Sequence, residues 1–174
     1  SECLVGSEMC IRDRYIQTAS SMIPAKVLGP DAGDHVLDMC AAPGSKTTHI
    51  AALMGNRGSI DAWDVYPHKV KLIKDNAKRL GISIIHTEVR DSVKPLPFLY
   101  ETYDKVLLDA PCSGLGVLGH KVELRWRRKE SDLSVFPPLQ KQLIEQAAKY
   151  TKTGGVLVYS TCTLNPDENE HIIN

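Results

Sequence analysis

Aspartate and cysteine side chains stand at the ends of most of the strand-like segments in this sequence. They are Asp38, Cys40, Asp64, Asp91, Asp109 and Cys162. A carboxylate in such a place can bind a ribose diol, and a thiol can act as a nucleophile or be a buried structural group. Each aspartate taken alone could equally cap a helix or a turn. Because the carboxyl ends of parallel strands meet at one edge of a sheet, the whole set predicts one ligand site there.

The elements that must position these side chains alternate along the chain. We expect strands at 35–39, 59–65, 82–89, 103–108 and 156–160, and helices at 20–28, 45–53, 68–80 and 138–151. We place Pro24 in the first turn of the first helix and a turn at Gly154-Gly155. Alternating strands and helices predict an α/β fold that is Rossmann-like, with a mostly parallel sheet and helices on both faces.

The segment Ala41-Ala-Pro-Gly-Ser-Lys46 links the first strand to its helix. Its small residues let a ligand approach the backbone, and Gly44 can adopt dihedral angles that a larger residue cannot. The segment matches neither the G-x-G-x-x-G dinucleotide fingerprint nor a Walker phosphate loop, so a pyrophosphate cradle is not expected. A nicotinamide dehydrogenase is therefore the weakest reading of this fold.

Three motifs resemble those of a known family. They read Asp38-Met-Cys-Ala-Ala-Pro-Gly-Ser-Lys46, Leu107-Leu-Asp-Ala-Pro-Cys-Ser-Gly114 and Tyr159-Ser-Thr-Cys-Thr163. In kind and order they are similar to signature motifs of the Sun/RsmB family of RNA cytosine-5 methyltransferases, and the resemblance runs from about Tyr15 to the C-terminus. It implies that S-adenosylmethionine is the cofactor and that the loop Cys40, Ala41, Ala42, Pro43, Gly44, Ser45 and Lys46 holds its methionine part. It also implies that Asp64 binds the ribose, Asp91 lies near the adenine, and Asp109 lies between cofactor and target base.

The chemistry implied by this resemblance needs a cysteine. Carbon 5 of cytosine becomes nucleophilic when a thiolate adds to carbon 6, and the reaction also needs an acid partner for the ring and a route for the carbon-5 proton. Pro111-Cys112 looks like the nucleophile motif of DNA cytosine-5 methyltransferases, so the residues alone leave Cys112 and Cys162 both open. The family resemblance implies that Cys162 is the nucleophile and that Cys112 assists product release.

Two further residues have alternatives. Asp109 is the candidate to contact the exocyclic amine or ring nitrogen of cytosine. Lys46 either orients Asp109, lowers the pKa of the thiolate or is a solvated lysine at a helix start.

The resemblance implies structured RNA as the partner of this chain. It is most like bacterial members of the family, which act on small-subunit ribosomal RNA. Transfer RNA is the alternative substrate, and a non-catalytic RNA-binding fragment and an amino-nitrogen methyltransferase are the rival activities.

Composition constrains the remaining possibilities. The formal net charge is zero, which argues mildly against nucleic-acid binding, but the segment 120–129 (HKVELRWRRK) carries a local basic excess in which Trp126 could stack on a nucleotide or serve as a packing anchor. Five cysteines without a C-x-x-C pair indicate neither a disulfide framework nor a zinc site, so no metal is expected. Without a membrane span or signal peptide, we expect a cytoplasmic protein, and we expect a monomer.

The two ends of the chain differ from its middle. Residues 1–14, which include Cys3 and Cys10, show no clean periodicity and resemble an artefactual addition, so we assign them no role. Residues 15–174 are expected to form the methyltransferase catalytic domain, incomplete at its C-terminal strands.

Overall fold

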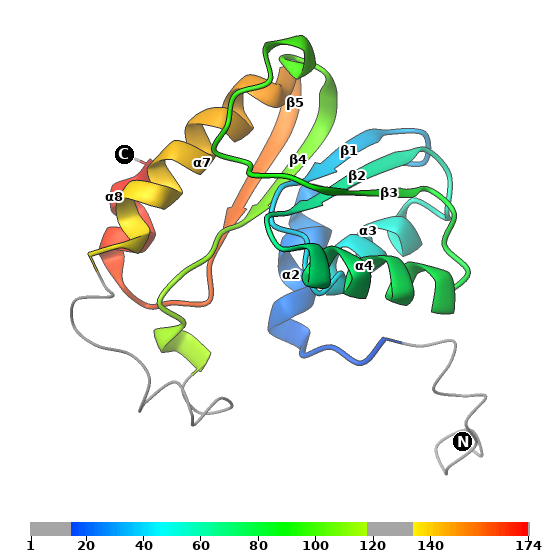
Figure 1. Ribbon diagram of the computed structural model, residues 1–174, viewed down its shortest axis with the longest axis horizontal. Helices are drawn as coiled ribbons and strands as arrows, with labels where there is room; N and C mark the ends of the chain where they lie inside the picture. The colour runs from blue at the N-terminus through cyan, green and yellow to red at the C-terminus, as the bar shows by residue number, and fades with distance from the viewer. Residues whose placement is uncertain (1–14, 118–133, 174) are drawn as a thin grey trace.

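The computed structural model describes residues 15–117 and 134–173. Its centre is a sheet of five parallel strands, which are β1 (His35–Asp38), β2 (Ser59–Asp64), β3 (Ile85–Val89), β4 (Tyr103–Asp109) and β5 (Thr151–Ser160). Their order across the sheet is β3-β2-β1-β4-β5, as Figure 1 shows. The order reverses between β1 and β4, and ligands of such open sheets bind beside that reversal. The predicted Rossmann-like α/β fold is confirmed.

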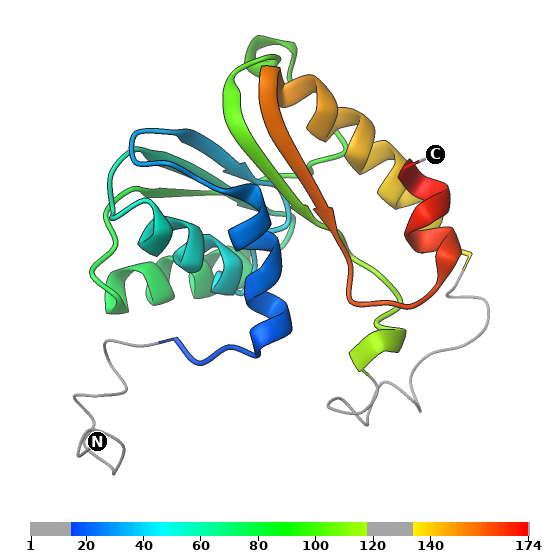
Figure 2. The same ribbon diagram turned by 180° about the vertical axis from the view of Figure 1, so that it is seen from behind.

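Helices cover both faces of the sheet. They are α2 (Ala19–Leu28), α3 (Ser45–Leu53), α4 (Pro67–Arg79), α7 (Phe136–Tyr150) and α8 (Glu170–Ile173). Short 3-10 turns lie at η2 (Pro97–Leu99), η3 (Leu115–Val117) and η4 (Pro166–Glu168). Figures 1 and 2 show α2, α3 and α4 on one face, with α7 and the short α8 on the other. The strands β1, β2 and β4 are therefore mostly buried, as their apolar composition requires, whereas the edge strands β3 and β5 are only partly covered.

Alternate residues of the central strands form the two halves of the core. Val36 and Leu107 point toward α2 and α3, whereas Leu37, Val106 and Leu108 point toward α7. On the α7 side, three aromatic rings pack at right angles: Trp63 contacts Tyr150 at 5.6 Å and Tyr103 at 6.4 Å between ring centroids. Apolar packing on both faces holds the strand ends, and with them the candidate site, in place.

The structure corrects two details of the sequence analysis. The predicted turn at Gly154-Gly155 lies inside β5, where the partner of Tyr103 is Thr151 but that of Lys105 is Val156. The extra residues form a bulge, and Gly154 adopts a φ of 82° there, which glycine tolerates.

Pro24 lies inside α2 rather than in its first turn, because the helix begins at Ala19. Proline has no backbone N–H, so the usual helical bond from this position to the carbonyl of Ser20 is missing. The remaining predicted elements are confirmed, although β3 starts three residues later than expected, at Ile85.

Candidate active site

Two cavities open at the carboxyl ends of the strands and share a wall. We name the first the Lys46 cavity; it has a volume of about 500 Å³, and its polar lining includes Asp38, Lys46, Ser160 and Thr161. We name the second the Asp64 cavity; it has a volume of about 440 Å³, and its polar lining includes Asp64, Arg90 and Asp91. The residues that line both cavities are Cys40, Ala42, Asp109 and Cys162. Ligands bound in the two cavities would therefore meet at these four residues.

The Asp64 cavity combines carboxylates with apolar walls. Asp64 is the last residue of β2, and its carboxylate accepts a hydrogen bond from the backbone N–H of Tyr66 at 3.1 Å. Asp91 follows β3 and accepts one from the N–H of Val93 at 3.2 Å. Leu139 and Leu143 of α7 close the opposite side. A carboxylate beside an apolar slot matches the ribose and base of a nucleoside.

The loop after β1 separates the two cavities. Cys40 and Ala42 line both, whereas Ala41, Pro43, Ser45 and Lys46 line only the Lys46 cavity. Gly44 lines neither: it adopts a φ of 98°, and a Cβ added there would lie 3.2 Å from the Cα of Ile73 in α4. Its small size thus serves the close approach of α4 to the loop, rather than the approach of a ligand.

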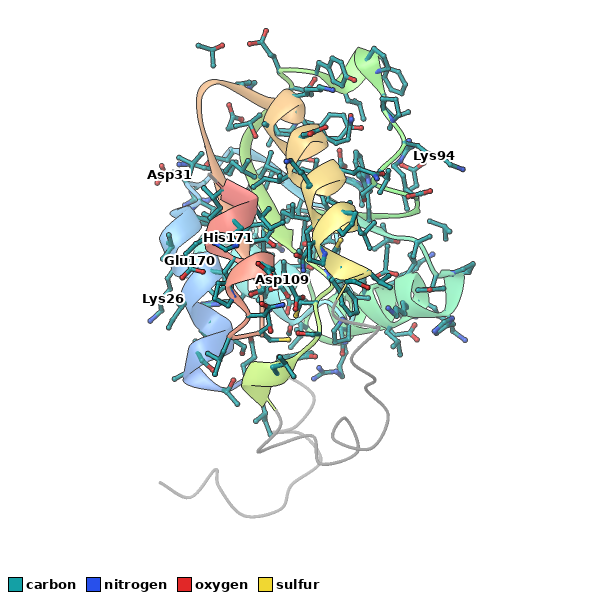
Figure 3. The ribbon with its side chains drawn as sticks, turned by 90° about the vertical axis from the view of Figure 1, so that its left-hand side faces the viewer. Lys26, Asp31, Lys94, Asp109, Glu170 and His171 are labelled. Atoms are coloured by element: carbon teal, nitrogen blue, oxygen red, sulfur yellow. The ribbon has the colours of Figure 1, made fainter. Side chains whose placement is uncertain are left out.

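Lys46 is bonded to Asp109 across the reversal in strand order. The Lys46 Nζ lies 2.5 Å from Asp109 Oδ2, and the Ser160 hydroxyl donates to Asp109 Oδ1 at 2.7 Å. The side chains of Lys46 and Asp109 are only 17% and 31% exposed, so water screens this ion pair weakly. Lys46 is therefore a partner of Asp109 and not a solvated lysine at a helix start. Figure 3 labels Asp109 near the middle of the molecule.

The two candidate cysteines meet although fifty positions separate them in the chain. The Cys112 and Cys162 Sγ atoms are 3.1 Å apart, and the Cys162 backbone N–H points to Cys112 Sγ at 3.3 Å. Cys162 is exposed and Cys112 is half-buried. The hydrogen bond with Cys162, followed by burial, raises the pKa of the Cys112 thiol far above its ordinary value. Cys112 is thus a proton-holding thiol beside a more accessible one.

Burial shifts two other titratable groups of the first motif toward their neutral forms. Burial raises the pKa of Asp38 to about 7, against the effect of the Thr47 hydroxyl, which donates to Asp38 Oδ2 at 2.7 Å. Asp38 Oδ1 is buried without a hydrogen-bond partner among the described residues. Burial, reinforced by Asp38, Asp64 and Asp109, raises the pKa of Cys40 as well. Cys40 is therefore a poor nucleophile, although it lies at the shared wall.

Ser160 is a site residue that the sequence alone does not reveal. Ser160 stands within the Tyr159–Thr163 motif, but its bond to Asp109 spans 51 positions of the chain, so spacing alone could not reveal it. The basic stretch 120–129, with Trp126, lies outside the described residues. Among the residues described, no cluster of ligating side chains suits a metal ion, and no helix is long and apolar enough to cross a membrane.

Comparisons with known proteins point to one family. The family model described as "16S rRNA methyltransferase RsmB/F" matches residues 25–174. The probable ribosomal RNA small subunit methyltransferase B of Bacillus subtilis is 46% identical over 160 residues, which cover 91% of this chain and 36% of that protein. The tRNA (cytosine(72)-C(5))-methyltransferase NSUN6 of Mus musculus is 43% identical over 90% of this chain and 35% of its own length. The chain thus spans a little over a third of these relatives.

Solved structures agree with this result. The crystal structure of NSun6 from Pyrococcus horikoshii with SFG matches 91% of this chain and 40% of that one, with 43% identity and a TM-score of 0.83. A SAM-dependent O-methyltransferase from Thermotoga maritima is only 17% identical, with a TM-score of 0.65. That second match shows a shared fold alone.

Proposed function

Because this chain belongs to the RsmB/F family of 16S rRNA methyltransferases, we propose that it transfers a methyl group from S-adenosylmethionine to carbon 5 of a cytosine in RNA. The observation that carries the proposal is the 3.1 Å approach of Cys112 to Cys162, which belongs to the wall shared by the two cavities. A thiol at this wall can add to a nucleobase in the Lys46 cavity and so activate it toward a methyl donor held in the Asp64 cavity.

The Asp64 cavity fits the proposed cofactor. Asp64 would accept hydrogen bonds from the ribose hydroxyls, and Asp91 lies beside the apolar slot that an adenine would fill. A homologue at 43% identity was solved with SFG, an analogue of S-adenosylmethionine. When bound, S-adenosylmethionine supplies an electrophilic methyl group. We assign its methionine part to Cys40 and Ala42, the two residues of the 40–46 loop that line this cavity.

Cys162 is the proposed nucleophile because it is the more exposed thiol and lines both cavities. Its thiolate adds to carbon 6, and carbon 5 then takes the methyl group. The Asp109 carboxylate then takes the carbon-5 proton, and the bond from sulfur to carbon 6 breaks, which returns the Cys162 thiolate. The Cys112 thiol, which keeps its proton, can hydrogen-bond to the departing Cys162 sulfur and so assist release.

Asp109 is the proposed contact of the cytosine. Its carboxylate can accept a hydrogen bond from the exocyclic amine, and Lys46 and Ser160 fix both of its oxygens in place. A cytosine reaches such a pocket only when it is unpaired or flipped out of its helix. These contacts recognise a cytosine but carry no information about the RNA that contains it.

We propose small-subunit ribosomal RNA as the substrate, which the Bacillus subtilis relative and the family description support. Transfer RNA remains the second candidate, because NSUN6 of Mus musculus is 43% identical to this chain. We further expect a cytoplasmic monomer whose catalytic domain spans residues 15–174, with residues 1–14 outside it.

Methyl transfer from labelled S-adenosylmethionine to small-subunit ribosomal RNA tests the proposal, with full-length protein and transfer RNA in a parallel assay. Cys162→Ala should be inactive and form no covalent adduct on denaturing gels, whereas Cys112→Ala should accumulate a protein–RNA adduct. If both variants still methylate, the cysteine mechanism is wrong and an amino-nitrogen methyltransferase takes its place. Cofactor binding without methyl transfer by the wild type would instead support a non-catalytic RNA-binding protein.

A further inference from the structure

A buried carboxylate lies behind the two cysteines and contacts the segments that carry both. Glu168, the last residue of η4, is fully buried. Its Oε2 accepts a hydrogen bond from the backbone N–H of Ser113 at 2.8 Å and another from Gln140 Nε2 at 3.1 Å. Its Oε1 accepts from Asn165 Nδ2 at 3.2 Å. Three N–H donors from three different segments thus converge on one carboxylate. None of the three donors belongs to a residue that lines the Lys46 cavity or the Asp64 cavity.

These bonds fix the backbone on both sides of Cys112. Ser113 follows Cys112, and its N–H is held by Glu168. Pro111 precedes Cys112, and its carbonyl accepts from the same Gln140 amide that donates to Glu168, at 2.9 Å. The position of the Cys112 sulfur is therefore set from both neighbouring peptide groups.

The loop of Cys162 is tied to the same cluster. The hydroxyls of Ser113 and Thr163, the residues that follow the two cysteines, lie 2.7 Å apart. The Tyr159 hydroxyl donates to the Glu168 carbonyl at 2.7 Å, which ties η4 to the end of β5. A further hydrogen bond, from the Gly116 N–H to the Cys162 carbonyl at 3.0 Å, joins the segment that follows Cys112 to the loop of Cys162. These contacts surround the place where the two sulfurs lie 3.1 Å apart.

We propose that Glu168 is a positioning residue for the two-cysteine centre, acting through Ser113, Gln140 and Asn165 rather than through substrate. The inference rests on the proposed function for its consequence in catalysis, but its geometric part concerns the thiols alone. Glu168 fixes the loop of Cys112 against that of Cys162, so that one thiol can hydrogen-bond to the other. Misplacement of reacting groups by about 1 Å can reduce a rate roughly 100-fold.

The three hydrogen bonds to Glu168 require a side chain in which both terminal atoms are acceptors, as in a carboxylate. In Glu168→Gln, the amide has only one acceptor oxygen, so its NH₂ group must face a donor whichever way it is turned. The Asn165 amide cannot turn to accommodate it without losing the bond from the Asp167 N–H to Asn165 Oδ1, which measures 3.2 Å. The substitution keeps the volume of the side chain while it breaks at least one of the three bonds.

The experiment compares Glu168→Gln with Glu170→Gln in the full-length protein. Glu170 lies exposed on α8, where Figure 3 labels it, and its substitution makes the same chemical change away from the cluster. Dibromobimane, which bridges two neighbouring thiols and then fluoresces, measures their proximity without any methyl transfer, and Cys112→Ala gives the background. We expect Glu168→Gln to bridge roughly 10-fold more slowly and to lose roughly 10- to 100-fold in kcat, with the Kd for S-adenosylmethionine unchanged. Glu170→Gln should match the wild type in all three.

Each outcome decides the inference. Wild-type bridging and turnover in Glu168→Gln would overturn it. A loss of bridging in Glu168→Gln, in a protein whose wild type methylates no RNA, would support the positioning role while rejecting the proposed function. If Glu168→Gln does not fold, as a lost thermal transition would show, Gln140→Met decides instead. That variant removes the donor to both Glu168 and Pro111 and should slow bridging roughly 3- to 10-fold, and unchanged bridging would overturn the inference.

Discussion

The two sides of the shared wall are built in different ways. On the cofactor side, Asp64 and Asp91 each accept a hydrogen bond from the backbone N–H two positions further along the chain. On the thiol side, the contacts join segments about fifty positions apart, as between Cys112 and Cys162 or between Asp109 and Ser160. The first side is held by local turns, and the second by the pairing of β4 with β5.

This difference predicts how many contacts a substitution on each side should disturb. A change on the local side should alter one ligand contact and leave the other side intact, because the turn around each carboxylate is self-contained. A change on the thiol side should disturb several contacts at once, because they belong to one network.

The largest effect beyond the cysteines themselves is expected at Lys46. Lys46→Met keeps most of the length of the side chain but removes the charge that holds Asp109, so kcat should fall roughly 10²- to 10³-fold, with little change in the Kd for S-adenosylmethionine. Single-turnover methyl transfer and cofactor titration measure the two quantities. Lys71→Met, on the exposed face of α4, is the matched control. A reduction in cofactor affinity as large as that in kcat would place Lys46 on the cofactor side and break the division.

A smaller effect, confined to binding, is expected at Asp64. Asp64→Ala removes the carboxylate proposed to bind the ribose and should weaken S-adenosylmethionine binding roughly 10- to 100-fold. Isothermal titration gives the Kd, and kcat at saturating cofactor should stay within a few-fold of the wild type. Asp64→Asn, which can still accept from the Tyr66 N–H, should lose less. Slower thiol bridging by dibromobimane in Asp64→Ala would show that the two sides are not independent.

The smallest effect is expected on the free energy of unfolding, and it concerns Asp38 at the end of the central strand β1. Because Asp38 has a pKa of about 7 when folded and near 3.8 when unfolded, the folded chain binds its proton more tightly. Raising the pH from about 5 to 7 should therefore lower the free energy of unfolding, by about 2 kcal/mol from this group. In Asp38→Asn that part of the pH dependence should vanish. Urea unfolding at several pH values measures it, and an unchanged slope would mean that Asp38 is ionised in the folded protein.

The fold was predictable because its signals are local. Apolar runs at 35–39 and 103–108, and the glycines that end helices, mark the elements without reference to the rest of the chain. The errors arose where tertiary packing overrides such signals. Gly154-Gly155 indicates a turn in isolation, but pairing with β4 turns it into a bulge within β5. Pro24 indicates a helix start, yet α2 continues through it.

The residues of the candidate site also fall into those that the sequence indicates and those that only the tertiary structure reveals. Asp64 and Asp91 could be singled out because each ends or follows a strand-like segment. Motif resemblance singled out the two cysteines, but neither resemblance nor spacing predicted that their sulfurs approach to 3.1 Å. Ser160 and Glu168 were missed, since a buried carboxylate held by three amides looks in the sequence like one acid in an acidic turn.

The fifty-residue separation of the two thiols also determines when the site can exist. Closing a long loop costs entropy that local turns do not, so contacts between distant segments form late in folding. The carboxylates of β1 and β2 can be in place as soon as the first strands pair. The sulfur pair must wait until β5 has docked against β4. A chain caught during synthesis or refolding would therefore already offer its carboxylates, while its thiols, still apart, could not yet act on an RNA.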